Sequence, residues 1–171
     1  NRPTTVKKRY RSQGKTLLRV SHLHQGSISS DLQKKLFSKV EEKISDADLI
    51  VYSDFNYGCL PQPLVDQLVN KSHRLGIVQA ADSQSSSQIG DISRFKGMNL
   101  LTPTEHEARV SLRNQQDGLI VLTESLRSRS RARNIILKMG AEGAILNMRE
   151  DGGLPQTDRI PELNTLPRDV V

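Results

Sequence analysis

The chain has 171 residues, and its 35% hydrophobic and 26% charged residues exclude a disordered protein and suit one domain with a substantial core. No apolar run approaches the roughly 18 residues that a membrane-spanning helix needs. The net charge of +6 comes without the aromatic residues that accompany nucleic-acid binding, because aromatics are 4% of the chain and Trp is absent. We therefore expect neither a membrane nor a nucleic acid as a partner.

The segment 4–20 predicts a β-hairpin. Two stretches rich in β-forming residues flank a turn at Ser12–Lys15. Charged side chains alternate along both stretches, so at least one face of the hairpin contacts solvent or a polar ligand. Phosphorylated small molecules bind to such cations, here Lys7, Lys8, Arg9 and Arg11. A second basic cluster, between Arg127 and Arg133, is interpreted as a solvated helix face.

Helices and strands alternate in the next part of the chain. Apolar residues recur every four positions from Ile28 to Ile44 and predict an amphipathic helix, with Ser30 and Gln33 as a capping box at its start. The apolar run at 49–52 predicts a buried strand. A helix over the 64–69 region, ended by Gly76, leads to further strands at 77–80 and 99–101, with a polar loop at 82–88 between them.

The same alternation continues toward the C-terminus. Thr102 with Glu105 predicts a capping box, with Pro103 at the first helical position. A further helix is expected around Leu122, then a strand at 134–138, a tight turn at 140–143 and a pairing strand at 144–146. Residues 148–171 are expected to be mainly irregular, with a short strand or two. Strands and helices joined by short connections predict an α/β domain with a mostly parallel sheet.

Four polar loops follow the predicted strands, at 53–58, 82–84, 102–107 and 138–143. In open parallel sheets, ligands bind beyond the carboxyl ends of the strands, where these loops meet. Each candidate residue has two interpretations. Asp54 suits a turn cap or a ligand contact, and Glu107 suits a Mg²⁺ carboxylate or the favoured first turn of a helix. The glycines of the last loop suit either a phosphate-binding backbone or a tight hairpin.

The order of these motifs resembles the PfkB (ribokinase-type) carbohydrate kinases, and among them the heptose-phosphate kinases of lipopolysaccharide precursor synthesis. Residues 2–7 and 17–20 look like the lid hairpin of that subgroup. Ser53-Asp54-Phe55 with Gly58 resembles its Asp-Tyr-x-x-Gly segment. Leu101-Thr102-Pro103-Thr104 with Glu107 resembles the Thr-Pro-Asn-x-x-Glu signature, and Lys138-Met139-Gly140 with Gly143 resembles the Thr-x-Gly-x-x-Gly nucleotide loop.

The resemblance implies a three-layer α/β/α ribokinase-like sandwich, incomplete at both ends, with residues 1–24 as a β-hairpin lid and 25–171 as a partial core. The implied reaction transfers the γ-phosphoryl group from Mg·ATP to a hydroxyl of a sugar or sugar phosphate, with heptose 7-phosphate as a candidate. The implied site residues are Arg9, Arg11, Arg19 and Asp54 for the substrate, Thr104, Lys138, Gly140 and Gly143 for the nucleotide, and Glu107 for Mg²⁺. Lid hairpins of this family also form dimer contacts, so a homodimer through the hairpin is expected.

The sequence departs from the family pattern at three places. Thr104 stands where the signature has Asn, and Asp82-Ser83-Gln84 replaces an Asp-Pro-Lys segment, so a cation is lost. Asp169-Val170-Val171 looks like the lead into the Gly-Ala-Gly-Asp loop that supplies the catalytic base and the anion hole. We therefore assign no catalytic residue within the chain, and expect the chain alone to be inactive.

Three functions remain open at this point. The first is a sugar kinase of which this chain is a part, and the second is a non-catalytic module that binds a sugar phosphate or a protein. A nucleic-acid-binding domain is third, because only the net charge supports it. The single cysteine, Cys59, cannot form an internal disulfide, which favours a reducing, cytoplasmic location.

Overall fold

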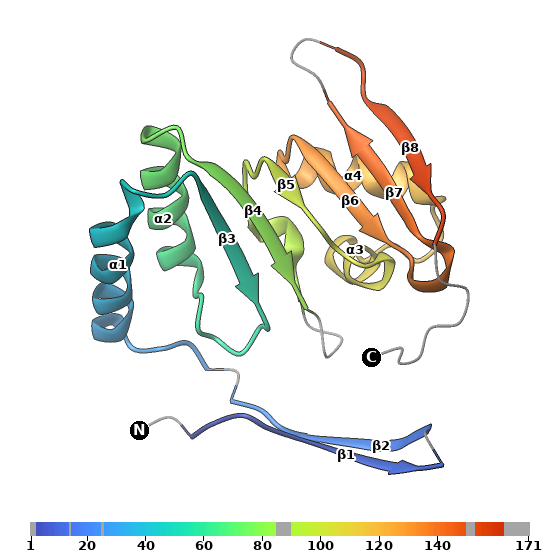
Figure 1. Cartoon of the computed structure of the whole chain (residues 1–171), viewed down its shortest axis with the longest axis horizontal. Coiled ribbons are helices and arrows are strands. Elements are labelled where there is room, and N and C mark those ends of the chain that lie inside the picture. Colours follow the sequence, from blue (N-terminus) through green and yellow to red (C-terminus); the bar gives the residue numbers. More distant parts are fainter. Residues whose placement is uncertain (1–2, 14, 25, 85–89, 150–152, 163–171) are drawn as a thin grey trace.

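The structure, a computed structural model, describes residues 3–13, 15–24, 26–84, 90–149 and 153–162. In these residues the chain forms a six-stranded sheet, four α-helices and a separate two-stranded hairpin (Figure 1). The α/β class, the mostly parallel sheet and the N-terminal hairpin are the ones predicted from the sequence.

The hairpin has one cationic face and one largely apolar face, on which Lys8 also lies, opposite Val20. It consists of β1 (Val6–Ser12) and β2 (Lys15–His22), antiparallel and exposed along almost their whole length. Directly paired residues share a face of a sheet, and side chains alternate between faces along a strand. Lys7, Arg9 and Arg19 therefore share one face, and Tyr10, Leu18 and Val20 share the other.

Helix α1 (Ser30–Ile44) begins one residue away from the predicted cap. Ser29 is the N-cap, and its hydroxyl accepts the N–H of Leu32 at 3.4 Å. The predicted capping box at Ser30 is therefore wrong, and the amide of Gln33 instead donates to the carbonyl of Ile28 at 2.9 Å. Most of the predicted apolar stripe is confirmed, because Ile28, Leu36 and Val40 pack on the core, whereas Leu32 is half exposed.

The large sheet has the strand order β3-β4-β5-β6-β7-β8, in which the first four strands are parallel and the last two antiparallel. Their bounds are β3 (Leu49–Asp54), β4 (Val78–Ser83), β5 (Leu100–Leu101), β6 (Asn134–Lys138), β7 (Ala144–Met148) and β8 (Gln156–Ile160). Asp82 and Ser83 thus end a strand, where the sequence predicted the start of a loop. Strand β8 is the short strand expected in the C-terminal segment.

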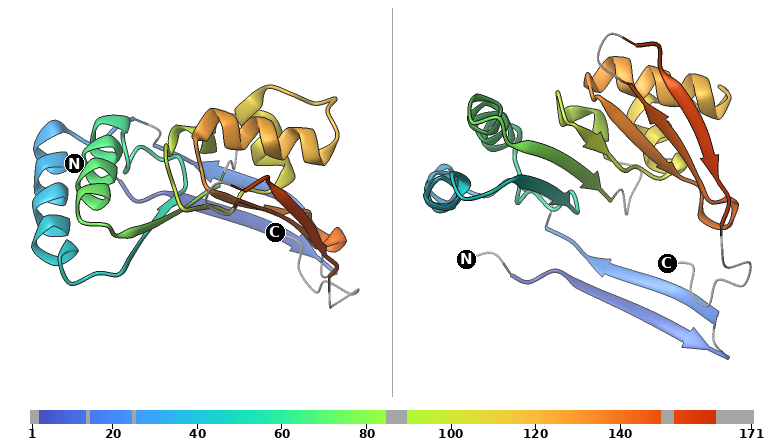
Figure 2. Two further views of the ribbon diagram at one scale, coloured as in Figure 1. Left: turned by 90° about the horizontal axis from the view of Figure 1, so that it is seen from above. Right: turned by 45° about the horizontal axis from the view of Figure 1, so that its top comes forward.

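The parallel strands are joined by α2 (Gln62–Arg74), by the 3₁₀ helix η1 (Ile92–Arg94), and by α3 (Glu105–Leu112) followed by α4 (Leu119–Ser130). Because parallel crossovers are right-handed and the strands are ordered consecutively, these connections fall on one face of the sheet. Figure 2 shows α2, α3 and α4 together on that face, with α1 beside α2. No helix in the described ranges is both long and apolar enough to cross a membrane.

The hydrophobic core lies between this face and the helices. Alternate strand residues such as Tyr52, Leu101 and Leu137 point into it and are buried with Phe95 of the η1 segment. The opposite face of the sheet carries exposed apolar side chains, including those of Leu49, Val51 and Val78. Alternation of side chains along each strand accounts for this difference between the two faces.

Asp91, which lies between β4 and β5, joins this part of the chain to α3 through hydrogen bonds. Its carboxylate caps η1 by accepting the N–H of Ser93 at 2.9 Å, and it also accepts the hydroxyls of Ser93 and Ser111. Burial alone would raise the pKa of Asp91. The hydrogen bonds from Ser111 and Ser93 and the charge of Arg129 together outweigh burial, so the pKa is below its ordinary value. The ionised form therefore stabilises this junction.

Asp91→Asn should lower the free energy of unfolding by about 1–2 kcal/mol at pH 7, because the charged acceptor of three hydrogen bonds is lost. A carboxyl with a lowered folded-state pKa stabilises the protein above its unfolded-state pKa of about 3.9, and this contribution is lost as the pH falls through the folded-state value. Urea unfolding at several pH values between acid and neutral should therefore show that the free energy of unfolding falls less steeply with acidification in the variant than in the natural protein. The exposed Asp48→Asn serves as the control, and parallel pH profiles for Asp91→Asn and the natural protein would contradict this account.

Candidate functional site

The hairpin lies next to the edge of the sheet where the parallel strands end (Figure 1). A direct contact joins the two: the ammonium of Lys7 lies 5.2 Å from the ring centroid of Tyr57 and 5.9 Å from that of Phe55. Both rings belong to the loop after β3, and such cation–π contacts are attractive. Because Lys7 shares a face with Arg9 and Arg19, the cationic face of the hairpin is held near the carboxyl ends of the strands.

A small hollow of about 210 Å³ lies on the hairpin, lined by Lys7, Lys8, Arg9, Arg19 and Ser21. Arg9 is directly opposite Arg19 in the antiparallel register. Like charges in this position repel, and an anion bound between them would remove the repulsion. Arg11 lies beyond the irregularity in the register at Tyr10/Arg11, opposite Thr16. Of the three predicted lid arginines, the structure thus brings Arg9 and Arg19 together.

Asp54 ends β3 and is only 4% exposed. Its carboxylate accepts from the guanidinium of Arg94 at 2.8 Å and from the N–H of Asn56 at 3.0 Å. Arg94 also donates to the carbonyl of Leu60 and stacks on the ring of Phe95. The pair therefore fastens the loop after β3 to η1, and contact of Asp54 with a substrate stays a prediction. Sequence reasoning missed Arg94, because no motif spacing connects two residues forty positions apart.

Asp82 connects the ends of three strands. One carboxylate oxygen accepts from the ammonium of Lys138 at 2.9 Å and from the hydroxyl of Thr102 at 3.0 Å. Lys138 is in turn bridged to Thr104, and its N–H donates to the carbonyl of Pro103 at 2.8 Å. The sequence placed Asp82 in one of the four polar loops at this edge and in a departure from the family pattern, but gave it no role of its own.

Helix α3 has its capping box two residues later than predicted. The Thr104 hydroxyl accepts the N–H of Glu107 at 3.2 Å, and the Glu107 carboxylate accepts the N–H of Thr104 at 2.7 Å. The box expected at Thr102 and Glu105 is wrong, because the Thr102 hydroxyl donates to Asp82 and Pro103 lies before the helix. Glu107 is 8% exposed, and its carboxylate is held at the start of α3 by the N–H of Thr104.

The glycine loop after β6 forms a 3₁₀ turn, η2 (Gly140–Glu142), in which Gly140 has φ +60° and Gly143 φ +86°. The Met139 N–H donates to the Gly143 carbonyl at 2.8 Å and closes the loop. A Cβ at Gly143 would lie 2.0 Å from the carbonyl oxygen of Ile160, so the packing of β8 requires a glycine there. Open space surrounds the position of a Cβ at Gly140, which leaves that part of the backbone accessible.

The residues at this edge fit Mg²⁺ bound together with phosphate. In phosphoryl-transfer sites, Mg²⁺ is bound by one or two carboxylates and by the phosphates themselves. Asp82 accepts from the Lys138 ammonium, and Glu107 accepts from the N–H of Thr104, whose backbone is bridged to that of Lys138, so the two carboxylates belong to adjoining segments of this edge. Within the part of the chain that the structure describes, no three His, Cys, Asp or Glu side chains could hold a metal by themselves. Asp169–Val171, the expected approach to a catalytic loop, lies outside the described residues.

Several bifunctional HldE proteins are among the curated proteins to which the chain is similar, whereas no protein-family model matches the sequence. The protein HldE of Helicobacter pylori strain Shi470 is 29% identical over 128 residues, which cover 73% of this chain and 26% of that protein. HldE of Desulfatibacillum aliphaticivorans is 24% identical over 151 residues, or 88% of this chain and 29% of that protein. The chain thus spans roughly a quarter of the length of these relatives.

Two solved structures show the fold. Ribokinase from Giardia lamblia superposes with a TM-score of 0.65 at 12% identity, over 93% of this chain and 48% of that one. Escherichia coli phosphofructokinase-2 in complex with substrates and products gives 0.64 at 14% identity, over 92% and 49%. The chain therefore has the ribokinase-like fold, is a homologue of the HldE proteins at low identity, and has sugar kinases of the PfkB and ribokinase type as its structural neighbours.

Proposed function

We propose that this chain supplies sugar-phosphate-binding and nucleotide-binding residues of an ATP-dependent sugar kinase. The observation that carries the proposal is the position of the cationic hairpin face, which Lys7 holds beside the loop after β3. The same edge of the sheet carries Lys138 and the accessible backbone at Gly140. Two sets of phosphate-binding groups therefore lie at one edge, as transfer of a phosphoryl group between two bound molecules requires.

The hairpin end of the site is proposed to bind the phosphate that the sugar already carries. Arginine guanidinium groups form paired, charge-assisted hydrogen bonds with phosphate. A bound phosphate would also separate the charges of Arg9 and Arg19, which face each other across β1 and β2. The similarity to HldE proteins makes heptose 7-phosphate the first candidate substrate. Arg11 and Asp54 remain proposed contacts to the same substrate.

The other end is proposed to bind Mg·ATP. The Lys138 ammonium and the backbone N–H groups of the Gly140–Gly143 turn would contact the phosphates, with Thr104 beside them. Glu107 would share Mg²⁺ with the phosphates, and the metal would neutralise charge that develops during transfer. Asp82 orients Lys138 through the 2.9 Å ion pair, so we add Asp82 to the proposed site.

ADP release by the full-length protein, supplied with Mg·ATP and a panel of sugars and sugar phosphates, tests the reaction. We expect turnover on a phosphorylated sugar, with heptose 7-phosphate first. Binding of a sugar phosphate without ADP release would favour the alternative, a non-catalytic sugar-phosphate-binding module. A folded protein that binds neither sugar phosphates nor ATP would overturn both functions.

The two ends of the site can be separated by substitution. Arg9→Gln or Arg19→Gln should raise KM for the phosphorylated sugar by about tenfold or more, because one charge-assisted hydrogen bond is lost. The same variants should leave KM for ATP within about twofold, whereas Lys138→Met should raise KM for ATP instead. Lys15→Gln, at the exposed start of β2, is the matched control in the hairpin. Equal effects of Arg9→Gln on both substrates would show that the hairpin does not bind the sugar.

The apolar face of the hairpin is proposed as a homodimer contact. Tyr10 and Leu18 are more than half exposed and lie opposite each other in the register. Leu18→Asp should therefore convert a dimer to a monomer in multi-angle light scattering, with Leu75→Asp, an exposed residue at the end of α2, as the control. A natural protein that is monomeric at micromolar concentration would refute the contact.

A cytoplasmic location also remains a proposal, based on the lone Cys59.

A further inference from the structure

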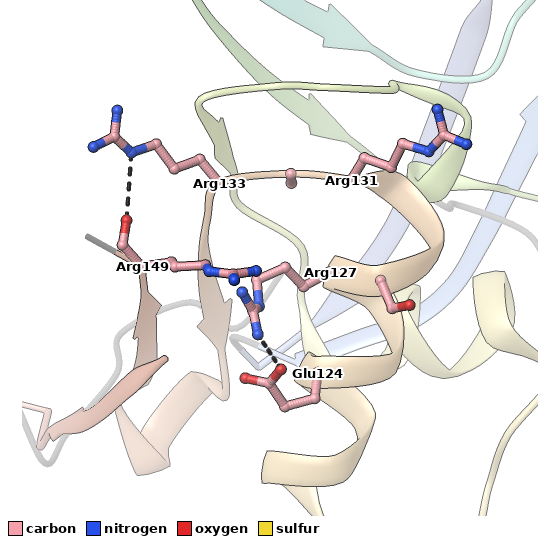
Figure 3. A pocket seen from close by; sticks show the side chains of 7 residues that line it. Glu124, Arg127, Arg131, Arg133 and Arg149 are labelled. Carbon is pink, nitrogen blue, oxygen red and sulfur yellow. Dashed lines mark hydrogen bonds and ion pairs between the residues drawn. The ribbon is translucent and has the colours of Figure 1, made fainter. Parts of the chain in front are cut away.

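A second basic region surrounds a hollow of about 520 Å³ at the end of α4 (Figure 3). Its charged lining consists of Glu124, Arg127, Arg131, Arg133 and Arg149. Four positive charges against one negative charge leave this lining strongly cationic. The sequence interpretation of a solvated face describes Arg129, Arg131 and Arg133, which are exposed, but not Arg127, which is 9% exposed.

The hollow, here called the arginine pocket, lies at the opposite edge of the sheet from the proposed kinase site. Arg131 and Arg133 belong to the link from α4 to β6, so they lie where β6 begins. Arg149 follows β7, which runs antiparallel to β6 and therefore ends at the same edge. Lys138 and the Gly140–Gly143 turn are at the other end of β6. The arginine pocket is thus a separate place on the molecule.

Arg127 and Arg149 both line the arginine pocket, and the charges of both act on the carboxylate of Glu124. Figure 3 shows the side chain of Arg149 extending toward that of Arg127, with Arg131 and Arg133 at the rim on either side. Arg127 is paired with Glu124, which also accepts from the amide of Asn147 at 2.6 Å. Burial alone would raise the pKa of Glu124. The hydrogen bonds from Arg127 and Asn147 and the charges of Arg127 and Arg149 together outweigh burial, so the pKa is below its ordinary value. One ionised carboxylate therefore faces two central guanidinium groups.

Arg127 is the buried member of this pair. Its residue is 9% exposed, and its Nε has no hydrogen-bond acceptor among the described residues. A guanidinium is always protonated, and a buried donor without an acceptor is unfavourable. The Nε of Arg133 donates to the backbone carbonyl of Arg149 at 3.4 Å. Among the described lining residues, positive charge therefore exceeds negative charge, and an external anion would balance it.

We propose that the arginine pocket binds a small molecule bearing a diphosphate or longer phosphate chain. The planar fork of a guanidinium matches phosphate oxygens, and an anion between Arg127 and Arg149 would accept from both. The volume of about 520 Å³ exceeds the needs of a single phosphate and leaves room for a linked group. This site is independent of the proposed kinase site, because the two share no residue.

Isothermal titration calorimetry of the full-length protein with pyrophosphate and with inorganic phosphate, at roughly 150 mM salt, tests the proposal. Pyrophosphate should bind about tenfold more tightly than phosphate, because it contacts both central arginines. Arg149→Gln should weaken pyrophosphate binding about tenfold, and Arg131→Gln, at the rim, about two- to threefold. Arg74→Gln, which removes the same charge from an exposed position on α2, should change nothing.

Arg127 is buried, so a substitution there could weaken binding by destabilising the fold. Its effect on binding is therefore measured together with the thermal unfolding midpoint. Arg127→Lys keeps the charge but removes the planar fork, so it should weaken pyrophosphate binding while the thermal unfolding midpoint without ligand stays close to that of the natural protein. Arg149→Gln should still weaken pyrophosphate binding about tenfold when it is added to Lys138→Met, which separates this site from the proposed kinase site. Loss of binding in Lys138→Met with full binding in Arg149→Gln would overturn the proposal, as would the absence of any pyrophosphate binding.

Discussion

The structure depends on the burial of one face of a parallel sheet against the helices that connect its strands. Right-handed crossovers between consecutive strands place α2, η1, α3 and α4 on that face, and Tyr52, Leu101 and Leu137 point into the core between the layers. The same geometry brings four strand ends to one edge. Polar residues scattered over more than eighty positions of sequence therefore become neighbours, and the candidate site follows from the packing of the core.

At that edge, most polar groups are engaged with one another. Asp54 is bound by Arg94, Asp82 by Lys138 and Thr102, and Glu107 by the N–H of Thr104. These contacts hold loops in position, because a buried carboxylate without partners would be unfavourable. Rigid placement of charged groups in this way is what a binding site for phosphates needs, since groups that are already oriented lose little freedom when the ligand arrives.

The sequence allowed the element types to be predicted, because a period of two or of 3.6 residues in apolar side chains reflects burial directly. The hairpin, the helices and the mostly parallel sheet of the α/β class were confirmed on this basis. The caps were wrong by one residue at Ser30 and by two at Thr102, because several neighbouring hydroxyl groups can occupy such positions and tertiary contacts select among them. The ion pair of Asp54 with Arg94 joins residues from two separate connections, and no local pattern reports it. The convergence of Arg127 with Arg149 escaped prediction for the same reason.

Because Arg9 is paired directly with Arg19, added salt should stabilise the hairpin rather than weaken it. Two like charges across neighbouring strands repel, and at physiological ionic strength this repulsion is screened over about 8 Å. Added salt thus favours closure of β1 against β2, whereas it weakens exposed attractive pairs such as Lys71 with Glu41. The hairpin is therefore loosest in dilute buffer without an anion, and it becomes tighter whenever an anion, dissolved or bound, lies between its two arginines.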